Sequence, residues 1–347
     1  MSGGRRDMEN TGEGLALLTP SDAVPASGTR VEVLVAEGLR KAYGPRLALR
    51  GLSFTLKAGR ILGFLGPNGA GKTTSIRILT TILEADAGHF AVDGIGHAHP
   101  DRIRRRIGVL PESFGLPRQT TGIEYLAYFG QLYGQSAGEA DVHGMELLDE
   151  VGMAKRARSL VGTYSHGMRQ RLGLARAHNN DPVVVFLDEP TLGLDPRGQQ
   201  ELLGLVRQIA RERGAGVILC SHLLTEVESV CDDVVIMSSG EVVASGPVAD
   251  VIGRTERNVV RIRVPAPALE ASQQALAITP GVKNVTAASG STGWLRVELN
   301  GVAPDDQGIN NRLLEPLIHA GIPVLSLEPE GGRLQDVFLQ LTSGAIQ

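Results

Sequence analysis

Gly66-Pro67-Asn68-Gly69-Ala70-Gly71-Lys72-Thr73 matches the pattern G-x-x-x-x-G-K-[ST], in which a glycine-rich loop joins a strand to a helix. The apolar run Arg60–Leu65 precedes it, and residues with helical spacing follow at Ile76, Leu79, Ile82 and Leu83. Glycines let backbone N–H groups close around phosphate oxygens, and a helix start adds partial positive charge. We therefore predict a phosphate-binding loop, with Lys72 at the β- and γ-phosphates and the Thr73 hydroxyl on Mg²⁺. A plain glycine-rich turn is the alternative.

Two further apolar runs predict buried strands. They are Val183–Leu187 and Gly216–Cys220, and each is followed by polar or glycine-rich residues and then by helical periodicity. Nearer the start, Val31, Val33 and Val35 recur at every second position, which predicts a strand with one strongly apolar face. Repeated strand–helix units indicate an α/β fold whose largely parallel sheet is buried by helices on both faces.

Two acidic residues, Asp188 and Glu189, directly follow the strand predicted at Val183–Leu187. Ligand sites of parallel sheets lie at the carboxyl ends of the strands. We expect Asp188 to complete the Mg²⁺ environment and Glu189 to polarise the attacking water as general base. An Asp-Glu pair after a strand can also cap a helix, so these roles depend on the phosphate-binding loop.

The stretch from Glu112 to Ser165 has a helical pattern without strands. Apolar residues recur there with the spacing of one helix face, at Tyr125, Leu126, Phe129, Leu132 and Tyr133. A shorter set predicts a second helix, at Met145, Leu148 and Val151. We interpret the stretch as a helical insertion into the sheet domain.

A second module follows a break near residue 252. Its predicted elements are a strand at 260–264, a helix at 267–277, strands at 282–288 and 294–299 around the turn Ser289-Gly290-Ser291, a helix at 309–320, a strand at 324–327 and a closing helix at 334–341. The order βαββαβ is that of a small α+β ferredoxin-like domain.

Composition and charge limit the possible functions. The chain has 347 residues, of which 42% are apolar and 21% charged, with a net charge of −4. This balance argues against a general nucleic-acid binder, and no apolar stretch approaches the roughly 18 residues of a membrane helix. Only two cysteines occur, Cys220 and Cys231, so a disulfide framework is excluded and a reducing compartment is expected.

These patterns predict three parts of the chain. Residues 1–29 are rich in Gly, Ser, Pro and Thr and predict a disordered tail. Residues 30–252 form the nucleotide-binding domain, with the helical subdomain at about 113–165. Residues 255–347 form an accessory domain, for which dimer stabilisation and small-ligand sensing are the alternatives.

Over residues 31–250 the sequence resembles an ABC-type ATPase, the nucleotide-binding subunit of an ABC transporter. Tyr164-Ser165-His166-Gly167-Met168-Arg169-Gln170 is similar to the signature motif of that family, usually Leu-Ser-Gly-Gly-Gln. Asp188-Glu189-Pro190-Thr191 with Gly193-Leu194-Asp195-Pro196 resembles its acidic strand and D-loop, and Ser221-His222 its switch histidine.

The resemblance implies that two copies of the chain bind two ATP molecules head to tail. Ser165 and Gly167 would then contact the γ-phosphate held by Lys72 of the second copy, and His222 would sense hydrolysis as a catalytic residue. Ser165 is also in position to cap the helix that begins there. Tyr43 would stack on adenine, with core packing as its alternative. The other positions expected to bind nucleotide are Gly66, Asn68, Gly69, Gly71, Thr73, Thr74 and Asp195.

Two departures from the family pattern stand out. Glu112 occupies the place of the Q-loop glutamine; it is an expected Mg²⁺ ligand, but it adds a third acid beside Asp188 and Glu189. In the signature motif, His166 replaces the first glycine and Met168 the glutamine. With the C-terminal module, these features resemble the exporter branch of drug, polysaccharide, lipid or sodium ABC subunits that serve separate permeases.

That resemblance implies a Mg²⁺-dependent ATPase in the cytoplasm, held on the inner face of the membrane by its permease. A cytoplasmic permease helix would dock beside the aromatic residues of the insertion, which alternatively form its core. The competing class is a soluble ABC ATPase acting on DNA or the ribosome. Residues 255–347 hold seven basic and nine acidic side chains, which argues against nucleic acid as a partner.

Overall fold

The computed structural model describes residues 31–113, 115–253, 259–287, 293–300, 307–330 and 333–342. The tail predicted at 1–29 and the turn predicted at 289–291 lie outside the described residues, as does Phe114.

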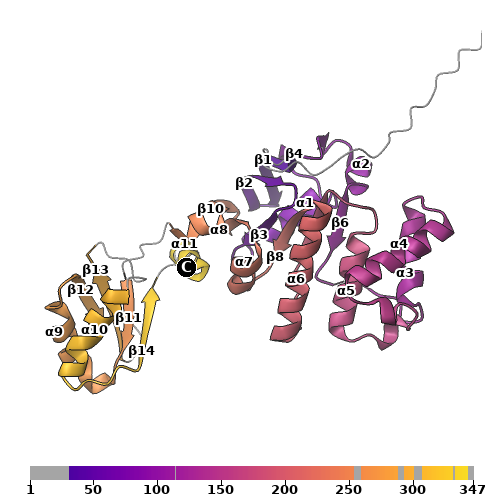
Figure 1. Ribbon diagram of the computed structural model, residues 1–347. Coiled ribbons are helices and arrows are strands. Elements are labelled where there is room, and N and C mark those ends of the chain that lie inside the picture. Colours follow the sequence, from indigo (N-terminus) through magenta and orange to yellow (C-terminus); the bar gives the residue numbers. More distant parts are fainter. Residues whose placement is uncertain are drawn as a thin grey trace, which may run out of the picture. The chain divides into compact units, whose positions relative to one another are not determined.

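A six-stranded sheet with the order β10-β9-β3-β8-β7-β6 forms the centre of the nucleotide-binding region (Figure 1). Its strands are β3 (Ile61–Leu65), β6 (Ile107–Leu110), β7 (Val184–Asp188), β8 (Gly216–Cys220), β9 (Asp233–Ser238) and β10 (Glu241–Pro247). All neighbouring pairs are parallel except β9 and β10. Strands β3 and β8 are buried at every residue, which explains their uninterrupted apolar sequences. The predicted parallel α/β sheet is confirmed.

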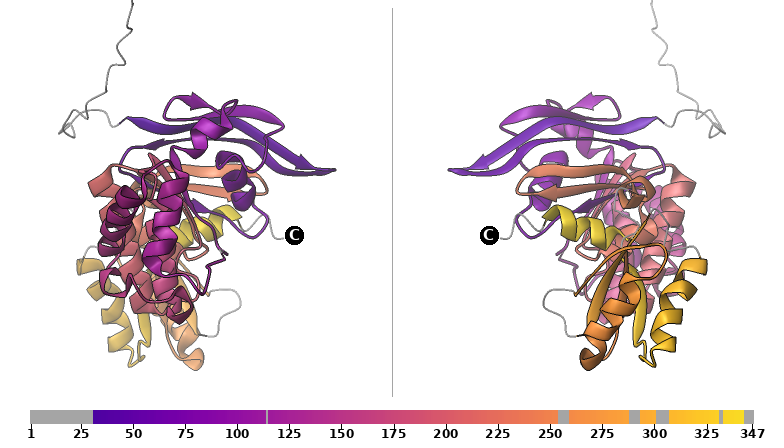
Figure 2. Two further views of the ribbon diagram at one scale, coloured as in Figure 1. Left: turned by 90° about the vertical axis from the view of Figure 1, so that its right-hand side faces the viewer. Right: turned by 90° about the vertical axis from the view of Figure 1, so that its left-hand side faces the viewer.

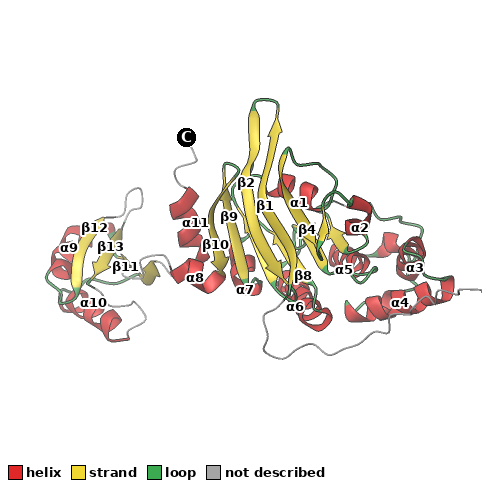
Figure 3. Ribbon diagram, turned by 90° about the horizontal axis from the view of Figure 1, so that it is seen from above, coloured by secondary structure: helices red, strands yellow, loops and turns green. Residues whose placement is uncertain are grey.

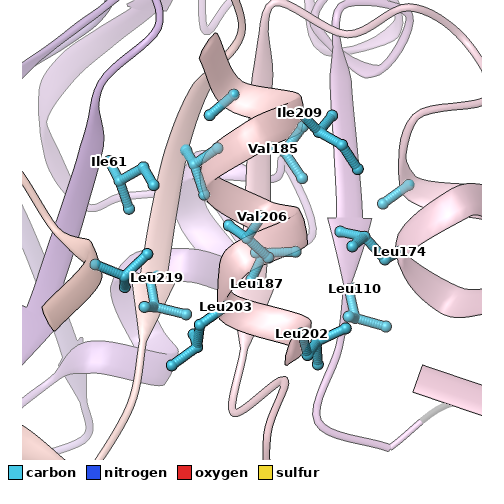
Figure 4. Close-up of a cluster of buried hydrophobic side chains, with 14 of the residues drawn as sticks. Ile61, Leu110, Leu174, Val185, Leu187, Leu202, Leu203, Val206, Ile209 and Leu219 are labelled. Carbon is cyan, nitrogen blue, oxygen red and sulfur yellow. The ribbon is translucent and has the colours of Figure 1, made fainter. Parts of the chain in front are cut away.

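Helices cover one face of this sheet. They are α5 (His166–Ala177), α6 (Pro196–Arg213) and α7 (Leu224–Val230), followed on the chain by the short α8 (Val248–Gly253). Figure 4 shows the apolar stripe of α6 among side chains of the strands, with Leu202, Leu203, Val206 and Ile209 near Val185, Leu187 and Leu219. Because side chains alternate along each strand, the next residues point to a second apolar cluster on the opposite face.

The opposite face is covered by α1 (Lys72–Leu79) and by a second sheet, not by helices alone as predicted. This antiparallel sheet has the order β2-β1-β4-β5 and consists of β1 (Glu32–Tyr43), β2 (Arg46–Lys57), β4 (Ala87–Val92) and β5 (Ile95–Gly96). Its long strands β1 and β2 lie side by side as a separate layer in Figure 2. The short helix α2 (Pro100–Arg104) leads into β6 and buries Ile103 in the same cluster.

The apolar face predicted for the first strand is confirmed only in part. Val33 is buried as predicted and Val35 is half-buried, but Val31 is 70% exposed. Leu34 and Ala36, which alternate with these valines, are also buried against the central sheet. The pairing of β1 with β2 contains several register shifts, and each shift changes which residues point to the core.

The helical insertion contains α3 (Gly122–Leu132) and α4 (Ala137–Glu150), which lie side by side in Figure 3. Both begin with a capping box, formed by Thr121 with Glu124 and by Ser136 with Glu139. Two short 3₁₀ turns follow, η1 (Ala154–Arg156) and η2 (Val161–Thr163). The predicted apolar face holds only for the first part of α3. Tyr125 and Leu126 are buried, but Leu132 and the following Tyr133 are 63% and 47% exposed.

The C-terminal module is the predicted ferredoxin-like fold. Its elements are β11 (Val259–Arg263), the 3₁₀ turn η3 (Ala266–Ala268), α9 (Leu269–Ala277), β12 (Val282–Ala287), β13 (Trp294–Leu299), α10 (Gln307–His319) and β14 (Ser326–Glu330). The antiparallel sheet order is β12-β13-β11-β14, and the module encloses an apolar cluster of its own. The predicted βαββαβ order is confirmed.

The last helix, α11 (Leu334–Thr342), does not pack on the C-terminal module. We predicted it as the closing helix of the module, but Leu334 and Val337 are buried in the cluster of the nucleotide-binding domain. The helix contacts α7 and α8, and the Leu334 backbone N–H donates to the Glu228 carboxylate at 3.1 Å. A stretch of apolar residues at helical spacing predicts a helix but does not specify which core it joins.

Candidate functional site

The phosphate-binding loop lies between β3 and α1. Gly71 precedes the helix with φ +107°, and a Cβ there would lie 2.7 Å from the Ala48 carbonyl oxygen, so only glycine fits. The Lys72 ammonium folds back across the loop and donates to the carbonyl oxygens of Gly66 at 2.5 Å and Pro67 at 3.3 Å. Its charge therefore lies over the loop that we expect to hold phosphate.

A cavity of about 320 Å³ opens beside this loop. The predicted residues that line it are Tyr43, Asn68, Gly69, Gly71, Lys72, Thr73 and Thr74. Tyr43 ends β1 and is 48% exposed, so its ring is open to a ligand and is not part of the core. A planar base could stack on it.

Arg46 also lines the cavity, and the sequence analysis missed it. Its guanidinium lies close to the loop, since a Cβ on Gly69 would be 2.9 Å from Nη2. The sequence feature that could have identified Arg46 is its place just after Gly44-Pro45, three residues from Tyr43, which we expected to stack on adenine.

The helix after the loop is shorter than predicted. It ends at Leu79, and Ile82, which we expected on its apolar face, is 73% exposed. Thr81 has φ +61°, a left-handed conformation that stops the helix.

Asp188 lies at the carboxyl end of β7 beside β8. Burial and, to a smaller extent, the charges of Glu112 and Glu189 together raise the pKa of the Asp188 carboxyl to about 6, and Lys72 opposes this rise. Both neighbouring acids therefore act on Asp188, and a cation beside Asp188 would offset their effect.

Glu189 and His222 form a hydrogen-bonded pair. The Glu189 Oε2 atom lies 2.8 Å from His222 Nδ1, so with an ionised carboxylate Nδ1–H donates and Nε2 is left for a ligand. Burial raises the pKa of Glu189, and the hydrogen bond from His222 opposes this rise. Glu189 has φ +48°, which is rare for a residue with a side chain. Its backbone N–H donates to the Cys220 carbonyl at 2.9 Å.

Ser221 and Glu226 support the loop that carries His222, and sequence reasoning missed this pair. The buried Ser221 hydroxyl donates to Glu226 Oε2 at 2.6 Å and accepts from the Leu223 N–H at 3.0 Å. A serine before His222 and a glutamate four residues after it were the signal, but their contact depends on the turn into α7.

Glu112 follows β6 and lines a second cavity of about 220 Å³. Residues from the insertion and from α5 complete its wall: Ser113, Leu116, Arg118, Val161, Gly162, His166, Arg169 and Gln170. Gln170 is buried, and its Oε1 has no hydrogen-bond partner in the described part of the chain. A group placed in this cavity would contact the Glu112 loop and the start of α5 together.

Ser165 and Asp195 begin α5 and α6 as N-caps. The Ser165 hydroxyl accepts from the Met168 N–H at 3.3 Å, and Asp195 Oδ1 accepts from the Gly198 N–H at 3.1 Å. Neither residue lines the cavity beside the phosphate-binding loop, and neither does Gly167. Asp188, Glu189 and His222 do not line that cavity either, but the charge of Lys72 acts on Asp188 and Glu189, and His222 is hydrogen-bonded to Glu189.

Oxygen donors at the first site suit Mg²⁺. The described residues contain no cluster of three His, Cys, Asp or Glu side chains that could enclose a metal ion. Magnesium ions in nucleotide sites take one or two protein oxygens and complete their shell with phosphate and water. The exposed Thr73 hydroxyl and the Asp188 carboxylate fit that pattern, with Glu112 as a further carboxylate.

Comparisons with known proteins identify the family of this chain. The family model described as "ABC transporter" matches residues 49–192. The linearmycin resistance ATP-binding protein LnrL of Bacillus subtilis is 33% identical over 317 residues, which cover 91% of this chain and 100% of that protein. The Nod factor export ATP-binding protein I of Ralstonia nicotianae is 35% identical over 313 residues, which cover 89% of this chain and 94% of that protein.

A solved structure shows the same fold. The structure described as the ATP-binding subunit of an ABC transporter has a TM-score of 0.58 and 30% sequence identity, and the match covers 64% of this chain and 92% of that one. Similarity at this level over the full length of LnrL shows the family. The chain therefore belongs to the ABC transporter family, as an ATP-binding protein of the exporter-related branch.

Proposed function

We propose that this protein is the Mg²⁺-dependent ATPase subunit of an ABC exporter and drives a separate membrane permease. The names of its relatives support export, since they describe linearmycin resistance, daunorubicin resistance and Nod factor export. Among the described residues, none of the helices is long and apolar enough to cross a membrane. We infer that the membrane path is supplied by the permease, which holds this chain on the cytoplasmic face.

One observation supports the head-to-tail dimer that we propose. The charge of Lys72 in the phosphate-binding loop acts on Asp188 and Glu189, and Glu189 is hydrogen-bonded to His222. Ser165, at the start of α5, does not line the cavity beside the loop. A helix start is an anion site, and the Ser165 hydroxyl, which accepts from the Met168 N–H, can still donate its own proton to an anion. Two copies placed head to tail would bring Ser165 of one to the γ-phosphate held by Lys72 of the other. ATP and ADP would then bind the closed dimer with different strengths, which drives opening and closing.

In this proposal each residue of the chain has a defined task. Lys72 neutralises the β- and γ-phosphates, and Glu189 accepts a proton from the attacking water. His222 keeps Glu189 in place through Nδ1 and presents Nε2 to the γ-phosphate. A bound Mg²⁺ would offset phosphate charge, held by Thr73 and Asp188 with Glu112 nearby.

The permease would dock on the helical insertion. Exposed apolar side chains gather on α3, on α4 and in the turn between them, at Tyr128, Leu132, Tyr133, Val142 and Met145. The 220 Å³ cavity beside Glu112 offers a place for a polar side chain of the docked helix, because Gln170 has an unused acceptor there. Solvent exposure of several large apolar side chains indicates a protein contact surface.

The variant Glu189→Gln tests the function directly. It keeps the shape of the side chain but removes the base, so we expect ATP to trap a dimer with turnover reduced at least a hundredfold. Size-exclusion chromatography with light scattering, with ATP and with ADP, measures the dimer. Turnover near the wild-type rate would refute Glu189 as the base. A wild-type specific activity that stays constant down to extreme dilution would refute the composite site.

A further inference from the structure

His166 makes a contact that the usual signature glycine could not make. It is the first residue of α5, and its Nε2 atom lies 2.7 Å from the Leu192 carbonyl oxygen. A carbonyl oxygen only accepts hydrogen bonds, so Nε2 must carry the proton and donate it. The side chain thus joins the start of α5 to the segment Thr191–Asp195, which we call the D-loop segment.

The D-loop segment fits closely against this ring. Gly193 has φ +77°, and a Cβ there would lie 3.3 Å from His166 Nε2, so backbone conformation and space both favour glycine. Gly167, the residue after His166, also lies close to this segment: a Cβ on it would be 3.5 Å from the Leu194 side chain, an ordinary contact distance. Leu194 in turn packs against the main apolar cluster. The first turn of α5 and the D-loop segment therefore form one packed unit.

The same segment is held to the catalytic end of β7. The Leu192 N–H donates to the Glu189 carbonyl at 3.2 Å, and the Leu194 N–H donates to the Thr191 carbonyl at 3.0 Å. Leu192 therefore uses its N–H toward Glu189 and its carbonyl toward His166. Two hydrogen bonds therefore lead from the backbone carbonyl of Glu189 through Leu192 to the side chain of His166, whose neighbour in the chain is Ser165.

We propose that His166 is a positioning residue that couples the two ATP sites of the dimer. This inference rests on the proposed function, in which Ser165 meets the nucleotide of the second copy while Glu189 acts on the nucleotide of its own copy. Any shift of the α5 start on closing would then move Leu192, and with it the backbone of Glu189. With glycine at position 166 this side-chain link would be absent.

The test compares His166→Gly with His166→Gln in the full chain, using ATPase rates against ATP concentration. Wild type should give a sigmoidal curve with a Hill coefficient well above one. His166→Gly should lower it toward one and lower kcat by roughly 2- to 10-fold, the range for an ordinary hydrogen bond. His166→Gln, which retains a donor, should restore most of the cooperativity. Ala137→Gly, at the same first position of the serine-capped α4, controls for glycine in a helix start.

A double-mutant cycle with Gly193→Ala sharpens the test. Alanine at this position should lower the Hill coefficient in wild type but have little further effect on it in His166→Gly. A Hill coefficient unchanged in His166→Gly, or equally lowered by Ala137→Gly, would overturn the coupling role. A wild-type Hill coefficient of one, with specific activity that still falls on dilution, would also overturn it and leave the dimer intact. Specific activity that is constant on dilution would instead refute the proposed function.

Discussion

At the scale of single residues, Asp188 has the most informative side chain of this site, because its pKa is raised. Its carboxyl is partly buried and is affected by the charges of Glu112 and Glu189, and its pKa of about 6 lies above the ordinary value near 3.8. Between these two pH values the folded chain retains a proton that the unfolded chain has lost. Stability therefore falls as pH rises through this range, and below it the cost vanishes.

This shift predicts a pH-dependent gain of stability in Asp188→Asn. Without metal and nucleotide, the variant should match wild type near pH 4 and exceed it in free energy of unfolding near pH 7, because asparagine cannot ionise. Urea unfolding in the presence of a chelator at several pH values measures the difference. The exposed Asp141→Asn serves as control. A difference that stays constant with pH would contradict the raised pKa.

At the scale of elements, the positions of the candidate catalytic and binding residues follow from the strained end of β7 and from the nearby helix starts. Glu189 is the first residue after β7, and its φ of +48° directs the backbone into the D-loop segment. Ser165 and Asp195 cap the two helices that flank this turn. Caps and tight turns are local, so their residue types were visible in the sequence, but the contact of His166 with Leu192 spans 26 positions.

The docking of α11 predicts that its buried residues stabilise the nucleotide-binding domain. Leu334→Ala should lower the free energy of unfolding of that domain by about 2–5 kcal/mol, the range for a buried leucine. Leu339→Ala, at a position 55% exposed on the same helix, should cost much less. Thermal unfolding followed in the presence and absence of nucleotide separates this domain from the C-terminal module. Equal effects of the two variants would refute the packing of α11 on α7 and α8.

At the scale of the whole molecule, the chain contains a second core that α11 does not join. The module from β11 to β14 buries its own apolar residues, and Arg261 lies over Trp294 with 4.5 Å between the guanidinium and the ring centre. Trp294 is the only tryptophan in the chain. Its fluorescence therefore reports on this module alone.

Independent folding of the module follows from its separate core. A fragment of residues 255–332 should unfold in urea in one cooperative step, with the fluorescence of Trp294 and the far-ultraviolet circular dichroism changing together. The fragment is small, so modest stability is expected. A gradual loss of signal without a transition would show that the module needs the rest of the chain.

The sequence alone was sufficient for the α/β class, the phosphate-binding loop, the acids after β7 and the ferredoxin-like order, because each depends on neighbouring residues or a regular period. It failed where the core-facing side of an element depends on register or on the element packed against it. Val31 is exposed, Leu34 and Ala36 are buried along with Val33, the end of α3 is exposed, and a second sheet joins α1 on one face. Arg46, Glu226 and the role of α11 were missed for the same reason.

Local patterns determined which elements form, because backbone hydrogen bonding and apolar periodicity act over a few residues. Only the tertiary structure decided that His222 binds Glu189 and that His166 meets Leu192. These two contacts join residues 33 and 26 positions apart. Their geometry is set by how strands and helices pack together, which residue order along a chain does not display.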